Sequence, residues 1–339
     1  MADTNPFANG CAWIEGQYVP IADARIPILD AGFVRSDCTY DVAAVWKGRF
    51  FRLDDHIDRL LAGCARIRLT PPASKDEVRS IMVEAVRRSE IRDAYVEVVV
   101  TRGVPTPGDR DSRRWTPRLY AYAIPYVWIV RPELQEAGTL NVVVARNTRR
   151  IPVGSVDPTV KNFHWGDLVR GLYEAYDRGG WLAIMPDGDG FVTEGAGFNV
   201  FAVNGGELYT PARGILLGIT RRTVLEIAEQ FGIPTHVTDM PVGDLFNADE
   251  VFLTSTAGGV MPVANLDGRP VGEGGTGPVT SRIRQQYWDL HQDPNLSFPV
   301  DYTPAPDETP RSVILPSPTA EPRAVSRRFG SWPVGTLEH

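Results

Sequence analysis

The chain of 339 residues is 43% hydrophobic, which is enough to bury a sizeable core and to form two domains. Its net charge of −7, without any run rich in lysine or arginine, argues against binding to nucleic acid. The apolar run 120–130 is too short to span a bilayer and residues 1–10 lack the features of a secretory signal, so we expect a cytoplasmic protein without membrane contact.

The first elements along the chain favour a small α/β domain over residues 1–130. A β-hairpin is expected around Glu15-Gly16, followed by a helix over 54–69 whose apolar residues recur on one stripe. A second helix begins at the capping box of Ser74 and Glu77.

Two β-rich runs, 94–101 and 118–128, follow and frame a polar loop over 103–117. A loop of this length inside a compact domain is usually functional or mobile. Residues 131–138 are expected to link this domain to the next one.

A second, larger α/β domain is expected over residues 139–302. It contains a strand-like run over 140–146, a helix after Gly166, a hairpin that turns at Gly205-Gly206 and a helix that ends at Gly232. Beyond it, residues 303–339 contain seven prolines, which predicts a disordered tail.

Lys161 stands out because only three of the 35 basic side chains are lysines. It lies between the β-branched pair Thr159-Val160 and the aromatic residues Phe163 and Trp165, so its amine is expected in partly apolar surroundings. Desolvation lowers the pKa of an amine, and an unprotonated lysine attacks carbonyl groups. A Schiff-base lysine and an ordinary surface lysine both fit this stretch.

Two other stretches could hold an anion such as a phosphate. Gly218-Ile219-Thr220 stands at a predicted helix start, where free backbone N–H groups attract negative charge, although Thr220 could also be a plain N-cap. Ser255 and Thr256 end a strand just before two glycines, in a turn that could cradle phosphate or simply reverse the chain.

Glu194 ends a short predicted strand before Gly195 and Gly197, so its carboxylate could reach a buried partner. Beside a pyridine nitrogen, a carboxylate keeps the ring protonated and makes it an electron sink. A solvated turn glutamate is the alternative.

No metal site is expected. Cys11, Cys38 and Cys64 lack the spacing of a zinc site or a disulfide framework. Asp187 and Asp189 do not match a calcium-binding loop and are interpreted as part of a hairpin turn.

The ordered stretches VKNFHWGDLVRG, TEGAGFNVF, GITRRTVLEIAE and FLTSTAGGVMPV, with LDDHIDRL nearer the N-terminus, resemble the fold type IV pyridoxal-phosphate aminotransferases. The resemblance covers about residues 10 to 302 and is strongest to the (R)-selective amine transaminases. It implies a two-domain α/β (α+β) fold like that of D-amino-acid and branched-chain aminotransferases, with 139–302 as the cofactor-binding domain, and a homodimer.

The resemblance also implies roles for individual residues. Lys161 would form the Schiff base with pyridoxal phosphate (PLP) and move the substrate proton, and Glu194 would pair with the pyridine nitrogen. The phosphate would be held by Arg59, the amides of Ile219 and Thr220, and Ser255 with Thr256. Arg59 rests on resemblance alone, since it lies off the apolar stripe of its helix and periodicity would make it a solvated arginine.

Substrate recognition is expected from several side chains that the same resemblance places near the pocket. A glutamate at position 97 would repel a substrate carboxylate, and Arg110, on the long loop, would swing in to bind the carboxylate of pyruvate. The full set of candidates is Arg35, Tyr40, Tyr95, Glu97, Arg110, Trp165 and Ala257.

The expected reaction moves the amino group of an (R)-configured primary amine to pyruvate and yields a ketone and D-alanine. Arg35 stands where the amine transaminases commonly have histidine, and His164 stands where they have glutamine. A second arginine near the pocket favours carboxylate substrates, so a D-amino-acid transaminase, or a related lyase acting on amino acids, is the alternative. A cofactor-binding protein without turnover is a third hypothesis, which the presence of both Lys161 and Glu194 disfavours.

Overall fold

The computed structural model describes residues 7–303. The tail that the sequence predicts to be disordered, 303–339, lies outside this range except for its first residue. Within the described part, no helix combines the length and the apolar character that a membrane crossing requires.

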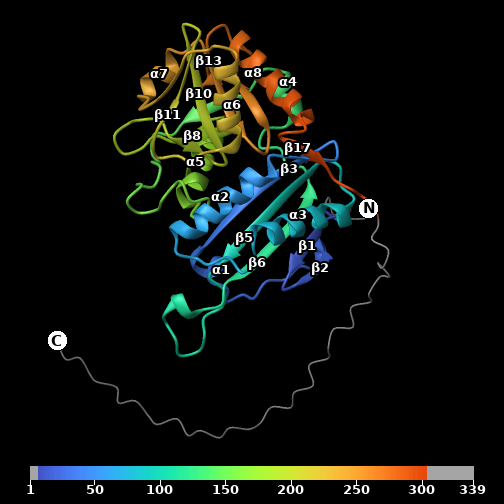
Figure 1. Ribbon diagram of the computed structural model, residues 1–339. Coiled ribbons are helices and arrows are strands. Elements are labelled where there is room, and N and C mark those ends of the chain that lie inside the picture. Colours follow the sequence, from blue (N-terminus) through green and yellow to red (C-terminus); the bar gives the residue numbers. More distant parts are fainter. Residues whose placement is uncertain (1–6, 304–339) are drawn as a thin grey trace, which may run out of the picture. The chain divides into compact units, whose positions relative to one another are not determined.

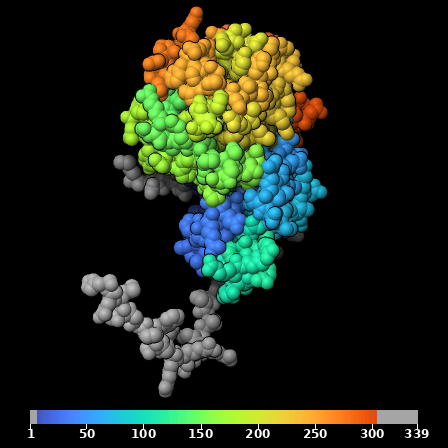
Figure 2. Space-filling model, turned by 90° about the vertical axis from the view of Figure 1, so that its left-hand side faces the viewer, coloured from blue at the N-terminus to red at the C-terminus, as the bar shows by residue number. Residues whose placement is uncertain are grey.

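The first part of the chain builds six strands of a seven-stranded antiparallel sheet, lower in Figures 1 and 2 and coloured blue to teal. The seventh strand comes from residues 297–299, near the end of the described chain, and is orange-red. In spatial order the strands of this sheet are β17 (Ser297–Pro299), β4 (Arg49–Phe51), β3 (Cys38–Trp46), β5 (Ala94–Thr101), β6 (Arg118–Pro125), β1 (Cys11–Ile14) and β2 (Gln17–Pro20). The predicted hairpin at Glu15-Gly16 is confirmed as the β1–β2 pair. Strand β6 ends at Pro125, earlier than predicted, although the Tyr126 N–H still donates to the Asp93 carbonyl oxygen at 2.9 Å.

Two amphipathic helices, α2 (Leu53–Arg66) and α3 (Lys75–Ser89), pack on this sheet. As predicted, α2 buries Ile57, Leu60 and Cys64, and α3 starts at the capping box of Ser74 and Glu77. The short helix α1 (Ala31–Arg35) and the 3₁₀ turns η1 (Ile21–Asp23) and η2 (Ser112–Arg114) complete this part.

The second part of the chain, green to orange in Figure 1, builds two further sheets. The larger sheet runs β12 (Thr235–Thr238), β11 (Glu207–Pro211), β10 (Phe198–Asn204), β13 (Glu250–Ser255) and β14 (Gly259–Val263), with β9 (Glu194–Gly195) beside β10. The smaller sheet runs β16 (Arg269–Pro270), β15 (Asn265–Leu266), β7 (Asn141–Val144) and β8 (Leu182–Ile184). The hairpin predicted at Gly205-Gly206 is the β10–β11 pair.

Five helices and a 3₁₀ turn are distributed over this part. They are α4 (Pro132–Glu136), α5 (Gly166–Asp177), α6 (Ile219–Gln230), α7 (Val242–Phe246), α8 (Pro278–Asp289) and η3 (Leu290–Gln292). The predicted helices after Gly166 and before Gly232 are therefore α5 and α6. The segment 131–138, predicted as a linker, holds α4, and the division into two domains stays a prediction.

One free strand edge determines where the site forms. Strand β4 covers only the end of β3, from Ala44 to Trp46, so the preceding residues of β3 have no strand on that side. There the Tyr40 N–H donates to the carbonyl oxygen of Lys161 at 3.0 Å, and the Thr39 hydroxyl donates to the same oxygen at 2.9 Å. The edge of the first sheet thus anchors a loop of the second part of the chain.

Candidate active site

A cavity of about 570 Å³ lies where the loop that carries Lys161 meets the ends of strands β9, β10 and β13. Of the residues proposed from the sequence, those that line it are Tyr40, Arg59, Tyr95, Lys161, Trp165, Glu194, Ile219, Thr220, Ser255, Thr256 and Ala257. Their roles remain predictions, but the fold gathers them from positions more than two hundred residues apart.

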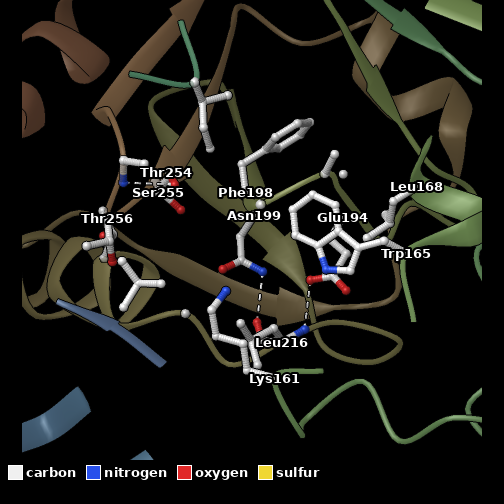
Figure 3. Close-up of a pocket in the computed structure, with 18 of the residues that line it drawn as sticks. Lys161, Trp165, Leu168, Glu194, Phe198, Asn199, Leu216, Thr254, Ser255 and Thr256 are labelled. Atoms are coloured by element: carbon white, nitrogen blue, oxygen red, sulfur yellow. Dashed lines mark hydrogen bonds between the residues drawn. The ribbon is translucent and has the colours of Figure 1, made fainter. Parts of the chain in front are cut away.

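Lys161 extends its amine into the centre of the cavity. Figure 3 shows this amine between the turn that carries Ser255 and Thr256 on one side and Glu194 on the other. The amine lies 4.5 Å from the centre of the Tyr40 ring. Burial lowers the pKa of the Lys161 amine below its ordinary value, and the Arg59 guanidinium lowers it further against the opposing carboxylates. A larger share of this lysine is therefore unprotonated and nucleophilic at neutral pH than of an exposed lysine.

Glu194 is buried with a dedicated set of donors and is no solvated turn residue, so that alternative is wrong. The Arg150 Nε and Nη2 groups donate to its Oε1 at 3.2 and 3.1 Å, and the Leu216 N–H donates to its Oε2 at 2.8 Å. Burial raises the pKa of the Glu194 carboxyl, while Arg150 opposes this effect and favours the carboxylate. Gly195 must be glycine because a Cβ would lie 2.5 Å from the Ala183 carbonyl oxygen.

The N-terminus of α6, predicted from the sequence as an anion site, lies at the other end of the cavity. Its N-cap is Gly218, which has no side chain to cap the helix, so the interpretation of Thr220 as a plain N-cap is wrong. The first N–H groups of a helix have no partner within the helix and attract negative charge. Asn199 lies beside this terminus and donates to the Leu216 carbonyl oxygen at 2.8 Å, which holds the chain that enters α6.

The turn between β13 and β14 faces this terminus. In it the Ala257 N–H donates to the Ser255 hydroxyl oxygen at 3.1 Å, and the Tyr126 hydroxyl donates to the Thr256 carbonyl oxygen at 2.5 Å. Thr254, just before the turn, lines the cavity with a buried hydroxyl that has no hydrogen-bond partner in the described structure. Buried hydroxyls normally have partners, so an oxygen-rich ligand such as a phosphate fits this end of the cavity.

Arg59 is not the solvated arginine that helical periodicity suggests. Its side chain is only 13% exposed and forms an ion pair of 2.7 Å with Asp41. It lies at the end of the cavity that also contains the α6 N-terminus, as the hydrogen bond from its Nη1 to the Leu217 carbonyl oxygen shows.

Three substrate candidates do not line the cavity of this chain. Glu97 is buried beside it and accepts a hydrogen bond of 3.0 Å from the Tyr95 hydroxyl. Arg35 lies 5.4 Å from the Trp115 ring and lines a neighbouring cavity of about 300 Å³, and Arg110 is exposed on the long loop.

Several residues of the site escaped the reasoning from sequence. Arg150, Asn199 and Thr254 carry no local pattern that would single them out. Asp41 does have a signal, because it is the one charged residue of the strand Cys38–Trp46, and a buried charge requires a partner.

Comparison with known proteins assigns the family. Residues 39–266 match the family model described as amino-transferase class IV. The chain belongs to the class IV aminotransferases. This membership confirms the predicted family and its mixed α/β fold.

Relatives of this class IV aminotransferase carry two kinds of name. A branched-chain-amino-acid aminotransferase of Methanocaldococcus jannaschii, named as putative, is 33% identical over 280 residues, which cover 82% of this chain and 95% of the relative. A D-alanine aminotransferase of Listeria monocytogenes is 31% identical over 290 residues, which cover 81% and 93%. The named activities therefore divide between branched-chain amino acids and D-alanine.

Solved structures agree with the fold of this class IV aminotransferase. A branched-chain amino acid aminotransferase of T.th. with pyridoxamine 5′-phosphate superposes with a TM-score of 0.80 at 26% identity, over 86% of this chain and 99% of that one. The enzyme of Thermoproteus uzoniensis with norvaline gives 0.78 at 30% identity over the same shares.

Proposed function

We propose that this aminotransferase uses PLP to move the amino group of an (R)-configured primary amine to pyruvate, giving a ketone and D-alanine. The observation that carries the proposal is that both arginines lining the cavity are already held by carboxylates. Arg59 pairs with Asp41, and Arg150 pairs with Glu194 and Asp167. Arg59 keeps free N–H groups but is assigned to the cofactor phosphate, and Arg150 is engaged by its two carboxylates. Among the described residues that line the cavity, neither arginine is therefore assigned to a substrate carboxylate, which suits an amine that has none.

The two ends of the cavity match the two ends of the cofactor. The amides at the start of α6, the Ser255–Ala257 turn and Arg59 would hold the phosphate, and Glu194 would face the ring nitrogen. PLP supplies an aldehyde that takes up the amino group and a ring that accepts electrons. The unpaired hydroxyl of Thr254 supports this orientation because it adds a donor at the phosphate end.

Lys161 would act twice. Its Nζ would hold the aldehyde group of the cofactor, and the freed amine would then accept the proton from the carbon that bears the amino group. Its lowered pKa favours both steps, since each needs the neutral amine. The hydrogen bonds from Thr39 and Tyr40 to its carbonyl oxygen keep its backbone in place during the proton transfer.

Apolar walls beside Lys161 would receive the carbon groups of the amine. Val42, Ile129, Trp165 and Phe198 line the cavity together with the Tyr40 ring. For the second half-reaction, Arg110 on the exposed long loop is our candidate for the carboxylate of pyruvate. In a homodimer this loop would serve the neighbouring copy.

A D-amino-acid transaminase is the second candidate, and a specific feature favours it. Arg35 lines the smaller cavity, which shares three of its lining residues, Val160, Asn162 and His164, with the main one. A carboxylate that extended between the two cavities would find an arginine there. The D-alanine aminotransferase relatives support the same assignment.

The deciding experiment follows the visible absorption of the purified holoenzyme after each of three donors is added. Loss of the cofactor band with (R)-1-phenylethylamine but not with the (S)-enantiomer supports the amine transaminase. Loss with D-alanine alone moves the assignment to the D-amino-acid enzyme. A band that no donor changes would show a cofactor-binding protein without turnover.

A further inference from the structure

Arg59 reaches the cavity with its guanidinium already oriented. Its Nε donates to Asp41 Oδ2 at 2.7 Å, its Nη2 donates to Asp41 Oδ1 at 2.9 Å, and its Nη1 donates to the Leu217 carbonyl oxygen at 3.1 Å. A guanidinium carries five N–H groups in a rigid plane. These three bonds therefore leave one N–H free on each terminal nitrogen.

Asp41 itself is fully buried and saturated with donors. Besides Arg59, its Oδ1 accepts from the Val42 N–H and from His56 Nδ1, each at 2.7 Å. Burial alone would raise the pKa of the Asp41 carboxyl, but the Arg59 guanidinium and the His56 hydrogen bond hold it below its ordinary value. Asp41 is thus a fixed negative charge behind Arg59.

The alternation of strand β3 explains why this charge stands where it does. Tyr40 and Val42 line the cavity, whereas Asp41 between them lies on the opposite face of the strand, where α2 brings His56 and Arg59. One strand therefore supplies a wall of the pocket and, from its other face, the anchor of the arginine.

We propose that Asp41, held by His56, is a positioning residue that orients Arg59 for the cofactor phosphate and sets how strongly the enzyme prefers a phosphorylated ligand. This inference rests on the proposed function, since it takes Arg59 as a phosphate ligand. Without Asp41, the arginine would lose two of its three anchors and would have to be ordered at the moment of binding.

The test compares two ligands that differ only by the phosphate. Binding of PLP and of pyridoxal to the apoenzyme is measured through the quenching of tryptophan fluorescence, since Trp165 lines the cavity. The variant is Asp41→Asn, which keeps the size of the side chain and removes its charge. The matched control is Asp267→Asn, because Asp267 is a similarly buried carboxylate paired with Arg178 at 2.6 Å and lines neither of the two cavities.

We expect Asp41→Asn to weaken PLP binding about tenfold to a hundredfold, as the loss of a charge-assisted hydrogen-bond geometry does, and to leave pyridoxal binding within about twofold. Asp267→Asn should leave the ratio of the two affinities unchanged. Equal losses for both ligands in Asp41→Asn, or no loss for either, would overturn the inference.

Should Asp41→Asn fail to fold, Arg59→Lys tests the same contact between Arg59 and Asp41. A lysine keeps the positive charge but cannot form the two-point contact with Asp41. If the orientation of Arg59 by Asp41 matters, this variant also loses the preference for PLP over pyridoxal. A retained preference contradicts the inference. If the wild-type enzyme binds both aldehydes through Lys161 and the variants keep the same ratio of the affinities for PLP and pyridoxal, only this inference is wrong. If the wild-type enzyme binds neither aldehyde, the proposed function is wrong as well.

Discussion

Among the single residues, the site depends on charges that are buried and compensated. Lys161, Arg59, Arg150 and Glu194 all line one cavity, and two of them have their pKa values shifted by burial away from the charged form. Shifts of this kind cluster at functional sites. The consequences can be measured on the apoenzyme, without turnover.

The lowered pKa of Lys161 predicts a pH effect on folding. In the unfolded chain the lysine keeps its proton up to about pH 10.4, whereas in the folded protein it loses it at a lower pH. Between these two values the unfolded state binds more protons, so the contribution of Lys161 to stability rises with pH. We expect the difference in unfolding free energy between wild type and Lys161→Met to shift in favour of wild type as pH rises through this window. Urea titrations of both apoproteins at several pH values measure it, and a difference that stays constant would contradict the lowered pKa.

Arg150 predicts a large stability effect because it stands between two carboxylates. Its Nη1 donates to Asp167 at 2.6 Å while Nε and Nη2 hold Glu194. Arg150→Met leaves both carboxylates without their cation, and breaking a buried pair costs about 3 kcal/mol or more. Arg146→Met removes an arginine whose side chain is 68% exposed, and should cost less than about 1 kcal/mol. Urea unfolding of the two variants compares them directly, and equal losses would argue against the Arg150 network.

Among the helices and strands, the start of α6 is the element that we propose to bind the phosphate through its backbone. Gly218 has an ordinary φ of −62°, so it is not needed for a special backbone conformation. A Cβ there would lie 2.2 Å from Asn199 Oδ1, so any side chain would push apart the two segments that we propose to form the phosphate end.

Gly218→Ala should therefore weaken the binding of PLP about tenfold, and the binding of pyridoxal less, because the amides of the helix start move. Gly243→Ala is the control, since a Cβ at Gly243 meets nothing within 4 Å. Fluorescence titration of both apoproteins makes the comparison. Unaltered binding by Gly218→Ala would mean that the helix terminus does not hold the phosphate.

For the molecule as a whole, the main feature is an exposed apolar surface around α1. Ile28, Leu29 and Phe33 are 73%, 62% and 65% exposed. Apolar residues gathered in this way mark interaction surfaces, and a second copy of the chain is the partner we expect, as for the predicted homodimer. Arg35 ends α1 and the long loop adjoins it through the bond from the Ala31 N–H to the Gly103 carbonyl oxygen. Such a dimer would thus bury Arg35 and Arg110, the two candidate substrate arginines outside the main cavity, or bring them to the site of the other copy.

Phe33→Glu is expected to weaken the dimer, because a charge replaces an apolar contact at its centre. Light scattering coupled to size exclusion should show a larger monomer fraction at micromolar concentration and lower activity. Val237→Glu, at an exposed position of β12, should leave the mass unchanged. A wild-type protein that runs as a monomer would refute the homodimer itself.

Local elements and the family could be predicted from the amino-acid sequence alone. Capping residues, glycine turns and apolar periodicity predicted α2, α3, α6 and both hairpins, because these signals act within a few residues. For Lys161 and Glu194 the local chemistry left two interpretations each, and the resemblance to the family selected them as site residues. The limits of β6 and of the 140–146 strand, observed at 118–125 and 141–144, were predicted less well.

The pairing of the charged side chains became visible only in the folded chain. Asp41 and Arg59 lie on different elements, and so do Arg150 and Glu194, so no local pattern couples them. Periodicity placed Arg59 in solvent because it describes one helix alone, whereas the free edge of β3 brings the loop of Lys161 and the start of α6 beside that helix. The electrostatics of the site arise from these contacts between distant segments, because burial and pairing are properties of the folded chain rather than of any one stretch of it.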